Sequence, residues 1–440
     1  MDYKPNETLI YQYFRFATFS LFQTPFIGAF NSINFYKMHN HRFFLFCFLY
    51  TLLFEAAFAQ TQQDFPNQPE LHWKYSTNAP IYASPVVDDN TVYVGSLDSV
   101  FYAIDMQKGQ LNWSFKTKGE IRSTACLTSN FLYFISSDGN VYCLNKQGKV
   151  EWAFSEGAEK KYDFADYHQS SPILQGNVLY FGLGNGFVYA INSTDGTLKW
   201  KTKTGGVVHG TPAIDKDKLY IGSFDGHVYA LNITDGCVVW SFKTVGHRYF
   251  PKGEVQGSPA IATNAIIIGA RDYNVYALDK EKGYAHWNKA FTKGWVLSNT
   301  YIDSTLYMAG ADERILTSID GKTLKENWKR NMAFLMFSKP AFSKTMLYIG
   351  TTMGKLHGID AQTGKDKWVF ATDGYKQNHL KYFKADDTYR DDIYSIITSN
   401  ETFLDAEVAL GGIFSTPAVY NGYILFSSTE GVVYCLKKKE

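Results

Sequence analysis

His209 is the clearest candidate for a residue that binds a ligand or a metal ion. It lies in the sequence VVHGTP, directly before a short segment with the composition of a β-strand. An imidazole is a common metal ligand and proton carrier, but a metal site needs a second ligand and none is evident beside this one. We therefore favour a hydrogen-bonded loop histidine, with a channel-facing binding residue as the alternative.

Four aspartates form an acidic cluster with side chains that could hold a calcium ion. Asp386, Asp387, Asp391 and Asp392 flank Arg390. Oxygen ligands suit Ca²⁺, but this spacing does not match an EF-hand loop. A charge run of this kind is more often a solvated loop face, which is our interpretation here.

The cysteines show no metal-binding or disulfide pattern. No two are adjacent, and none has the C-x-x-C spacing of a zinc or redox site or of a haem attachment. Cys143 and Cys435 occupy equivalent places in the segments VYCLN and VYCLK, where related segments have alanine, so we expect small buried core residues. The full set is Cys47, Cys126, Cys143, Cys237 and Cys435.

A repeated pattern of four short β-type segments positions these residues. One copy, within residues 211–244, reads TPAI, KLYIGS, DGHVYALN, TDG and VVWSFKT. The Asp-Gly pairs supply the positive φ angles that tight hairpin turns need. A four-stranded repeat with a period of about 40 residues is typical of a propeller blade.

Regularly spaced tryptophans give the number of repeats. A tryptophan in every blade is best interpreted as a residue that packs one blade against the next. The sequence therefore predicts an all-β, eight-bladed β-propeller of four-stranded antiparallel blades. The tryptophans are Trp73, Trp113, Trp152, Trp200, Trp240, Trp287, Trp328 and Trp368.

The two ends of the repeat region are incomplete in complementary ways. The last copy stops after its third strand, VVYCL at 432–436, whereas an unmatched tryptophan strand stands at 71–77. We expect strand 71–77 to complete the last blade and close the ring, which removes free sheet edges. Truncation of 71–77 should then destabilise the whole ring.

The residues before the repeats have the features of an export signal. A basic pair, His41 and Arg42, precedes an apolar run that ends at Ala57-Phe58-Ala59, a typical cleavage site. The run is too short to predict a membrane span, and Phe46 before Cys47 argues against a lipoprotein. We predict an upstream extension at 1–37 that is not native, a signal peptide at 38–59 cleaved after Ala59, a linker at 60–70 and the propeller at 71–440.

The third strand and the tryptophan strand share a motif that identifies a family. Its copies read YAID…G…W at 102–113, YAIN…G…W at 189–200, YALD…G…W at 276–287 and HGID…TG…W at 357–368. They resemble the tryptophan-docking motif A-x-D-x-x-T-G-x-x-x-W of pyrroloquinoline-quinone (PQQ) repeat propellers. The sixth copy departs from it, with TSIDG at 317–321, and we expect an irregular turn with one extra residue there.

This resemblance leaves three classes of function to weigh. The nearest branch is the non-catalytic one that includes the propeller component of the β-barrel assembly machinery. It implies a periplasmic or secreted, monomeric scaffold that binds protein partners, with outer-membrane assembly components as candidates and with no cofactor or metal. The alternatives are a PQQ-dependent dehydrogenase with calcium, disfavoured by the absence of adjacent cysteines, and a carbohydrate- or small-ligand-binding propeller. The formal net charge of +1 argues against nucleic acid as a partner.

Three insertions indicate where a partner would bind. Residues 156–169, 245–256 and 373–414 each follow a tryptophan strand, so all three should emerge on one face of the ring. Their aromatic and arginine residues are types favoured at interfaces, although they could instead pin their own loops. The candidates are Tyr162, Phe164, Tyr167, Arg248, Tyr249, Phe250, Tyr382, Phe383, Tyr389 and Arg390.

Overall fold

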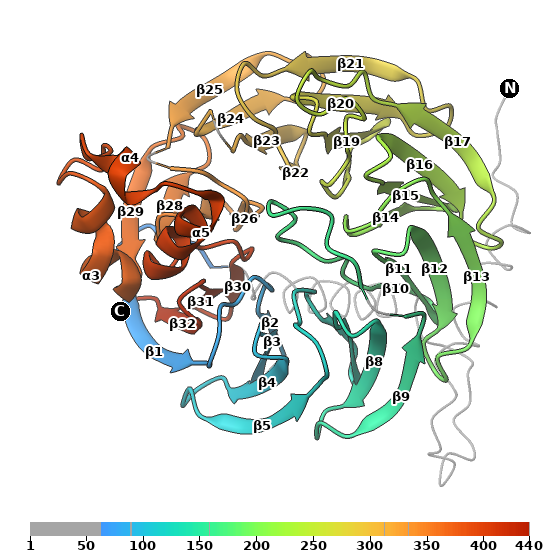
Figure 1. Cartoon of the computed structure of the whole chain (residues 1–440), viewed down its shortest axis with the longest axis horizontal. Coiled ribbons are helices and arrows are strands. Elements are labelled where there is room, and N and C mark those ends of the chain that lie inside the picture. The colour runs from blue at the N-terminus through green and yellow to red at the C-terminus, as the bar shows by residue number, and fades with distance from the viewer. Residues whose placement is uncertain (1–62, 89, 158, 312, 333, 440) are drawn as a thin grey trace, which may run out of the picture. The chain divides into compact units, whose positions relative to one another are not determined.

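The computed structural model describes residues 63–439 except 89, 158, 312 and 333. These residues form eight four-stranded antiparallel sheets arranged as a closed ring (Figure 1), which confirms the predicted eight-bladed propeller. The predicted upstream extension, the signal peptide with its cleavage site, and Cys47 lie outside the described residues.

Blades 1 to 4 follow one another along the chain, each from its innermost to its outermost strand. Blade 1 has β2 (Val86–Val87), β3 (Thr91–Gly95), β4 (Val100–Asp105) and β5 (Leu111–Lys116); blade 2 has β6 (Cys126–Leu127), β7 (Phe131–Ile135), β8 (Asn140–Asn145) and β9 (Val150–Ser155); blade 3 has β10 (Ile173–Gln175), β11 (Val178–Gly182), β12 (Phe187–Asn192) and β13 (Leu198–Lys203); blade 4 has β14 (Ala213–Asp215), β15 (Lys218–Gly222), β16 (His227–Asn232) and β17 (Val238–Lys243).

Blades 5 to 7 repeat this order, and blade 8 takes its outermost strand from the beginning of the propeller. Blade 5 has β18 (Ala260–Ile261), β19 (Ala265–Gly269), β20 (Asn274–Asp279) and β21 (Ala285–Ala290); blade 6 has β22 (Ser298–Ile302), β23 (Thr305–Ala309), β24 (Ile315–Asp320) and β25 (Glu326–Asn331); blade 7 has β26 (Ala341–Phe342), β27 (Met346–Gly350), β28 (Lys355–Asp360) and β29 (Asp366–Ala371); blade 8 has β30 (Ala418–Tyr420), β31 (Tyr423–Ser427), β32 (Val432–Lys437) and β1 (Glu70–Ser76).

The strand sequences match their places in the blade. In blade 4, every residue of β15 after Lys218 is buried, because neighbouring blades cover both faces of a middle strand. In β17, Trp240 alone is buried, because the outermost strand faces solvent on one side.

Each tryptophan joins its blade to the next one. The indole Nε1 of Trp113 donates a hydrogen bond to the carbonyl of Lys146 in blade 2, at 2.9 Å. The ring also covers Gly148, which has a φ of +80° and no room for a Cβ, because that atom would lie 2.6 Å from the indole. The motif Trp and Gly are therefore two halves of one inter-blade contact.

The N-terminal strand closes the ring, as predicted. β1 pairs antiparallel with β32, and Trp73 lies opposite Cys435. The segment before β1 also takes part: Phe65 is buried, and its carbonyl accepts a 2.6 Å hydrogen bond from the indole of Trp368. Residues of the predicted linker thus supply the docking carbonyl that blade 8 would otherwise lack.

The prediction of an extra residue in the blade 6 turn is wrong. Asp320 and Trp328 have the same separation as Asp360 and Trp368, so the turn has no extra residue. The turn closes in the usual way, with the amide of Leu324 donating to the carbonyl of Asp320 at 2.8 Å. The difference is that Leu324, with a φ of +61°, occupies the position of the motif glycine.

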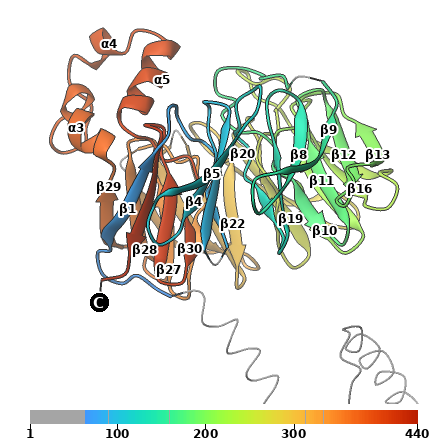
Figure 2. The same ribbon diagram turned by 90° about the horizontal axis from the view of Figure 1, so that it is seen from below.

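The longest insertion is helical. It contains α3 (Asp373–Tyr382), α4 (Ile393–Ile396) and α5 (Asn400–Ala409), which stand above one face of the ring (Figure 2). The hydroxyl of Thr372 caps α3 by accepting from the Tyr375 amide, and Ser399 and Thr402 form a capping box on α5. No helix in the described part of the chain is long and apolar enough to cross a membrane.

Candidate functional site: the insertion face and the central channel

Residues 156–170, which we call the central loop, cross the middle of the ring between blades 2 and 3 (Figure 1). His209, at the start of blade 4, holds this loop in place. Its Nδ1 lies 2.8 Å from Asp166 Oδ2 and its Nε2 lies 3.0 Å from Glu159 Oε1, and all three side chains are buried. One imidazole therefore bridges two carboxylates of the central loop.

The charge of this cluster is fixed at neutral pH. Desolvation disfavours a charged His209, but its hydrogen bonds to Asp166 and Glu159 outweigh this cost and raise its pKa to about 9. The same contact with His209 lowers the pKa of Asp166 against the effect of burial. Because both ring nitrogens donate to carboxylates, His209 is the hydrogen-bonded histidine we favoured and has no nitrogen left for a metal ion.

A buried arginine anchors the middle of the central loop. Arg271 in blade 5 is fully buried, and its Nη1 donates to Asp163 Oδ2 at 2.5 Å. Its Nε donates to Gln256 Oε1 at 2.9 Å, and Gln256 in turn donates to the carbonyl of Ala165 at 3.2 Å. The guanidinium also lies over the ring of Phe224, at 5.0 Å. The loop is thus tied to blade 4 by the buried His209 cluster and to blade 5 by Arg271, whose partner Asp163 is partly exposed.

Aromatic side chains from the ring pack against Tyr167 of the central loop. Tyr167 lies against Tyr82, Phe337 and Phe414, with ring centroids 5.9, 5.2 and 4.9 Å apart. These partners come from blades 1, 7 and 8, so the loop is packed against both halves of the ring. Contacts of this kind stabilise beyond the apolar area that they bury.

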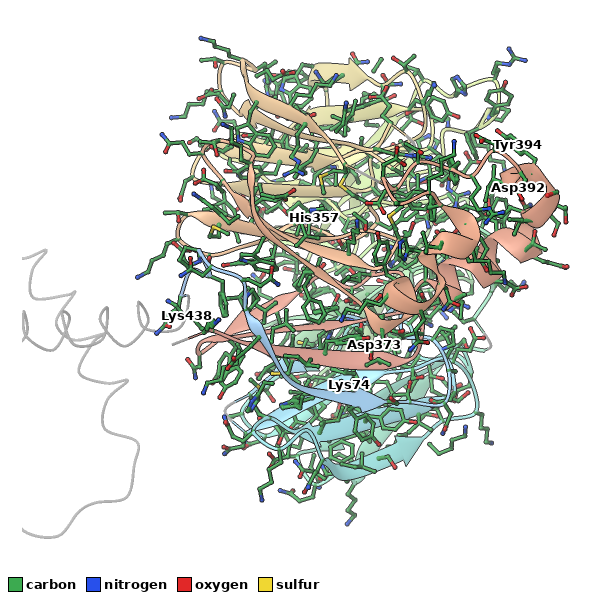
Figure 3. The ribbon with its side chains drawn as sticks, turned by 90° about the vertical axis from the view of Figure 1, so that its left-hand side faces the viewer. Lys74, His357, Asp373, Asp392, Tyr394 and Lys438 are labelled. Atoms are coloured by element: carbon green, nitrogen blue, oxygen red, sulfur yellow. The ribbon has the colours of Figure 1, made fainter. Side chains whose placement is uncertain are left out.

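The helical insertion is joined to the ring at the start of α3. Asp373 forms an ion pair with Lys74 of β1 (Figure 3), and the amide of Gly374 donates to Glu430 Oε2 at 2.6 Å. On α5, the carboxyl of Glu407 points inward and is 1% exposed. Burial raises the pKa of Glu407 to about 8, so this side chain is mostly neutral at physiological pH.

The channel contains a cavity of about 610 Å³, and His168 and Gln169 of the central loop form part of its lining. The starts of the innermost strands surround it, with one hydroxyl residue from most blades and Lys339 from blade 7. Apolar residues of the innermost strands, such as Ile173 and Leu174, form part of its wall. Among the described residues that line it there is no aspartate or glutamate.

A model of the family described as outer membrane protein assembly factor BamB matches residues 66–241, 137–270 and 250–379. These matches together cover most of the chain and all but the last blade. The chain belongs to this BamB family. No curated protein sequence matches the chain significantly.

Solved structures share the fold of this BamB-family chain at low sequence identity. BamB from Moraxella catarrhalis superimposes with a TM-score of 0.62 at 13% identity, covering 84% of this chain and 100% of that one. Quinohemoprotein alcohol dehydrogenase from Comamonas testosteroni gives 0.64 at 14% identity, covering 86% and 78%. The designed protein Ika8 gives 0.64 at 16% identity, covering 84% and 100%. At these identities the likeness shows the eight-bladed fold and not the activity.

The predicted partner-binding residues divide into buried and exposed groups. Tyr382 and Phe383 are 4% and 2% exposed, and Phe383 packs edge-on against Phe334 at 5.3 Å. Tyr167 is buried within the central loop, and Tyr389 is half-buried against the Arg314 guanidinium, at 5.1 Å. For these residues the structure supports the alternative we raised, that insertion aromatics pin their own loops.

The other candidates remain at the surface of the BamB-family ring. Tyr249 is 63% exposed and Arg248 lies over its ring at 4.8 Å, whereas Phe250 is half-buried against Trp295. Two further candidates are partly accessible on the central loop, Phe164 at 47% and Tyr162, whose hydroxyl donates to Glu254 at 3.0 Å. Arg390 is half-buried and paired with Asp392 at 2.8 Å.

The acidic cluster does not converge on a single point. Asp387 pairs with Lys355 and accepts from the Tyr375 hydroxyl at 2.5 Å, while Asp391 pairs with Lys384 at 2.6 Å. Asp386 accepts from the neighbouring Thr388 hydroxyl. No group of three or more His, Cys, Asp or Glu side chains within the described ranges is arranged to hold a metal ion. Among the cysteines, Cys143 and Cys435 are buried, as expected, whereas Cys237 is exposed.

Two important residues were missed at the sequence level. Arg271 stands in the turn after β19 with no motif around it, so its role depends on Asp163, far away in the sequence. Lys339 did carry a signal: it occupies the blade-opening position at which the other seven blades have serine or threonine. Aligning the openings residue by residue would have singled it out.

Proposed function

We propose that this BamB-family propeller is an exported, non-catalytic scaffold that binds protein partners on its insertion face, in the assembly of outer-membrane proteins. One observation carries the proposal. The four most exposed large apolar side chains in the described part of the chain all lie on the insertions of that face: Tyr394 at 88%, Val245 at 73%, Tyr249 at 63% and Leu380 at 58%.

Part of the backbone that carries these side chains is held in place. Thr372 caps α3, on which Leu380 lies, and Arg271 donates to Gln256 at the end of the second insertion, so exposed groups there need less ordering when a partner binds. Tyr394 lies beside Asp392 on the helical insertion (Figure 3) and is 88% exposed. Exposed apolar groups gathered on one face are typical of an interaction surface.

The test is affinity capture from the native envelope with matched variants of the full chain. One variant changes Tyr394, Val245, Tyr249 and Leu380 to serine. The control changes four exposed apolar residues of outermost strands, Leu71, Leu111, Leu198 and Val238, to serine. We expect outer-membrane assembly components with the unchanged and control proteins and their loss with the insertion variant. Equal capture by all three, or by none, contradicts the proposal.

A second assay separates the scaffold from an enzyme. We expect no dye-linked alcohol oxidation after addition of PQQ and Ca²⁺, because a scaffold needs no redox group. Oxidation that depends on both additions would replace the scaffold with a quinoprotein dehydrogenase.

A further inference from the structure

The blade openings form a ring of hydroxyl groups around the channel. The backbone amide of Thr416 donates to Ser84 Oγ at 2.9 Å, and that of Ser84 donates to Thr124 Oγ1 at 3.2 Å. The same bond runs from Thr124 to Ser171, from Ser171 to Thr211 and from Thr211 to Ser258, at 2.9, 3.2 and 2.9 Å. Five successive blade junctions therefore use one hydroxyl as an acceptor.

This arrangement leaves donors directed toward the cavity. A hydroxyl that accepts from a backbone amide still has its own hydrogen to donate. Ser84, Thr124, Ser171, Thr211 and Ser258 all line the cavity, as does Gln169, which is 5% exposed and whose amide nitrogen has no partner in the described structure. The walls are thus rich in donors and, within the described lining, contain no carboxylate to accept from them.

Lys339 replaces the hydroxyl in blade 7. The register of β26 places it there, because Ala341 lies opposite Tyr348 just as Val86, after Ser84-Pro85, lies opposite Tyr93. An ammonium group cannot accept the hydrogen bond that each ring hydroxyl accepts. The other cationic groups at the cavity are paired, Arg122 with Glu120 at 2.6 Å and His209 as described.

The charge of Lys339 is not compensated within the described protein. None of the described carboxylates forms an ion pair with it, and desolvation lowers its pKa to about 8. The nearby His168 is neutral, since desolvation lowers its pKa to about 4. Lys339 is only partly exposed, and a partly buried cation without a partner is costly to the fold, so a bound anion would offset the cost.

We propose that the central channel binds a small organic carboxylate, whose anionic group contacts Lys339 and the ring hydroxyls and whose apolar part lies against Ile173 and Leu174. The cavity volume is within the range of small-molecule sites. A carboxylate accepts several hydrogen bonds and neutralises the ammonium, so it matches both the donors and the charge. This site is separate from the partner surface proposed above.

The experiment is calorimetric titration of the full chain with benzoate, its neutral isostere benzamide and inorganic phosphate. Lys339→Ser restores the residue type of the other blades, so this variant should fold at least as well. Lys344→Ser, which removes an exposed lysine of the same blade, is the matched control. Binding is measured in buffers of different ionisation enthalpy at a pH near the pKa of Lys339, which reports proton uptake.

We expect benzoate to bind with uptake of a proton, because the carboxylate raises the pKa of Lys339. Lys339→Ser should weaken this binding by at least about tenfold and abolish the uptake, whereas Lys344→Ser should change neither. Three outcomes overturn the proposal. Benzamide binds as tightly as benzoate, Lys339→Ser leaves benzoate binding unchanged, or benzoate does not bind. If phosphate binds in a way that depends on Lys339 and benzoate does not bind, the choice of an organic carboxylate is overturned.

Discussion

Nδ1 of His209 lies 2.8 Å from Oδ2 of Asp166, in the buried interior of the propeller. Asp166 belongs to the central loop and His209 to blade 4, so this contact joins an insertion to the ring. Glu159 completes the cluster at 3.0 Å from Nε2. A protonated imidazole is therefore one of the groups that hold the central loop in the channel.

Replacement of His209 with asparagine should lower the free energy of unfolding by about 3–5 kcal/mol, since it leaves two buried carboxylates without their cation. Denaturant unfolding followed by tryptophan fluorescence measures the loss. The matched control is His227→Asn, because that histidine is partly exposed and contacts a single aspartate, Asp225, at 3.3 Å. Equal losses for the two variants would contradict a special role for His209.

The same cluster predicts a dependence on pH. The pKa of His209 is raised from 6.5 in the unfolded chain to about 9 in the folded one. Its stabilising contribution is therefore complete below pH 6.5 and is lost as the pH rises through 9. Melting temperatures recorded across this interval should fall more steeply for the unchanged protein than for His209→Asn, and parallel curves would refute this account.

Glu407→Gln should stabilise the protein at alkaline pH. Burial raises the pKa of Glu407 from 4.5 to about 8, so the neutral form favours folding below pH 4.5 and this advantage disappears as the pH rises through 8. A glutamine stays neutral at every pH. Hydrogen exchange of α5 at pH values below and above 8 measures the effect, and Glu401→Gln, an exposed change on the same helix, serves as its control.

Leu324→Gly should raise the free energy of unfolding by up to about 1 kcal/mol. A left-handed conformation costs a branched residue about 1–2 kcal/mol, which exceeds the entropy cost of a glycine in the unfolded chain. The opposite substitution at the equivalent position of blade 7, Gly364→Leu, should be strongly destabilising, because a Cβ there would lie 2.6 Å from the indole of Trp328. Chemical denaturation of both variants gives the two signs, and a loss of stability in Leu324→Gly would be the contrary result.

Two aromatic residues from the insertions should behave in opposite ways. Phe383→Ala removes a buried ring and should cost about 3–5 kcal/mol, whereas Tyr249→Ala should change stability by no more than about 0.5 kcal/mol. Thermal unfolding measures both. If Tyr249→Ala melts much earlier than the unchanged protein, its ring is a structural support and not part of a free surface.

The fold could be predicted because its signal repeats. Trp113 or Gly148 alone means little, but a tryptophan in every repeat and a glycine in most of them determined the number of blades, the strand order and the closure by residues 71–77. The role of Phe65 could not be predicted in this way, because its segment replaces a missing part of the repeat but does not have the repeat's sequence.

The candidate site could be predicted only as a set of segments. Tyr249 and Tyr382 are the same residue type in similar surroundings of sequence, yet one is exposed and the other buried. Their difference arises from contacts with distant residues, as does the pairing of Asp163 with Arg271. Insertions have no periodic sequence pattern that would show which of their residues face the protein interior.

The closure of the ring also affects the order in which the protein folds. Glu70–Ser76 is synthesised before the other strands, but its partner Val432–Lys437 is synthesised after all of them. Until those last residues are available, β1 has no neighbour to pair with and Trp73 has no blade to join. Because a contact between such distant segments forms slowly, completion of the propeller should be a late event, and a chain released before residue 432 should remain an open and aggregation-prone array of blades.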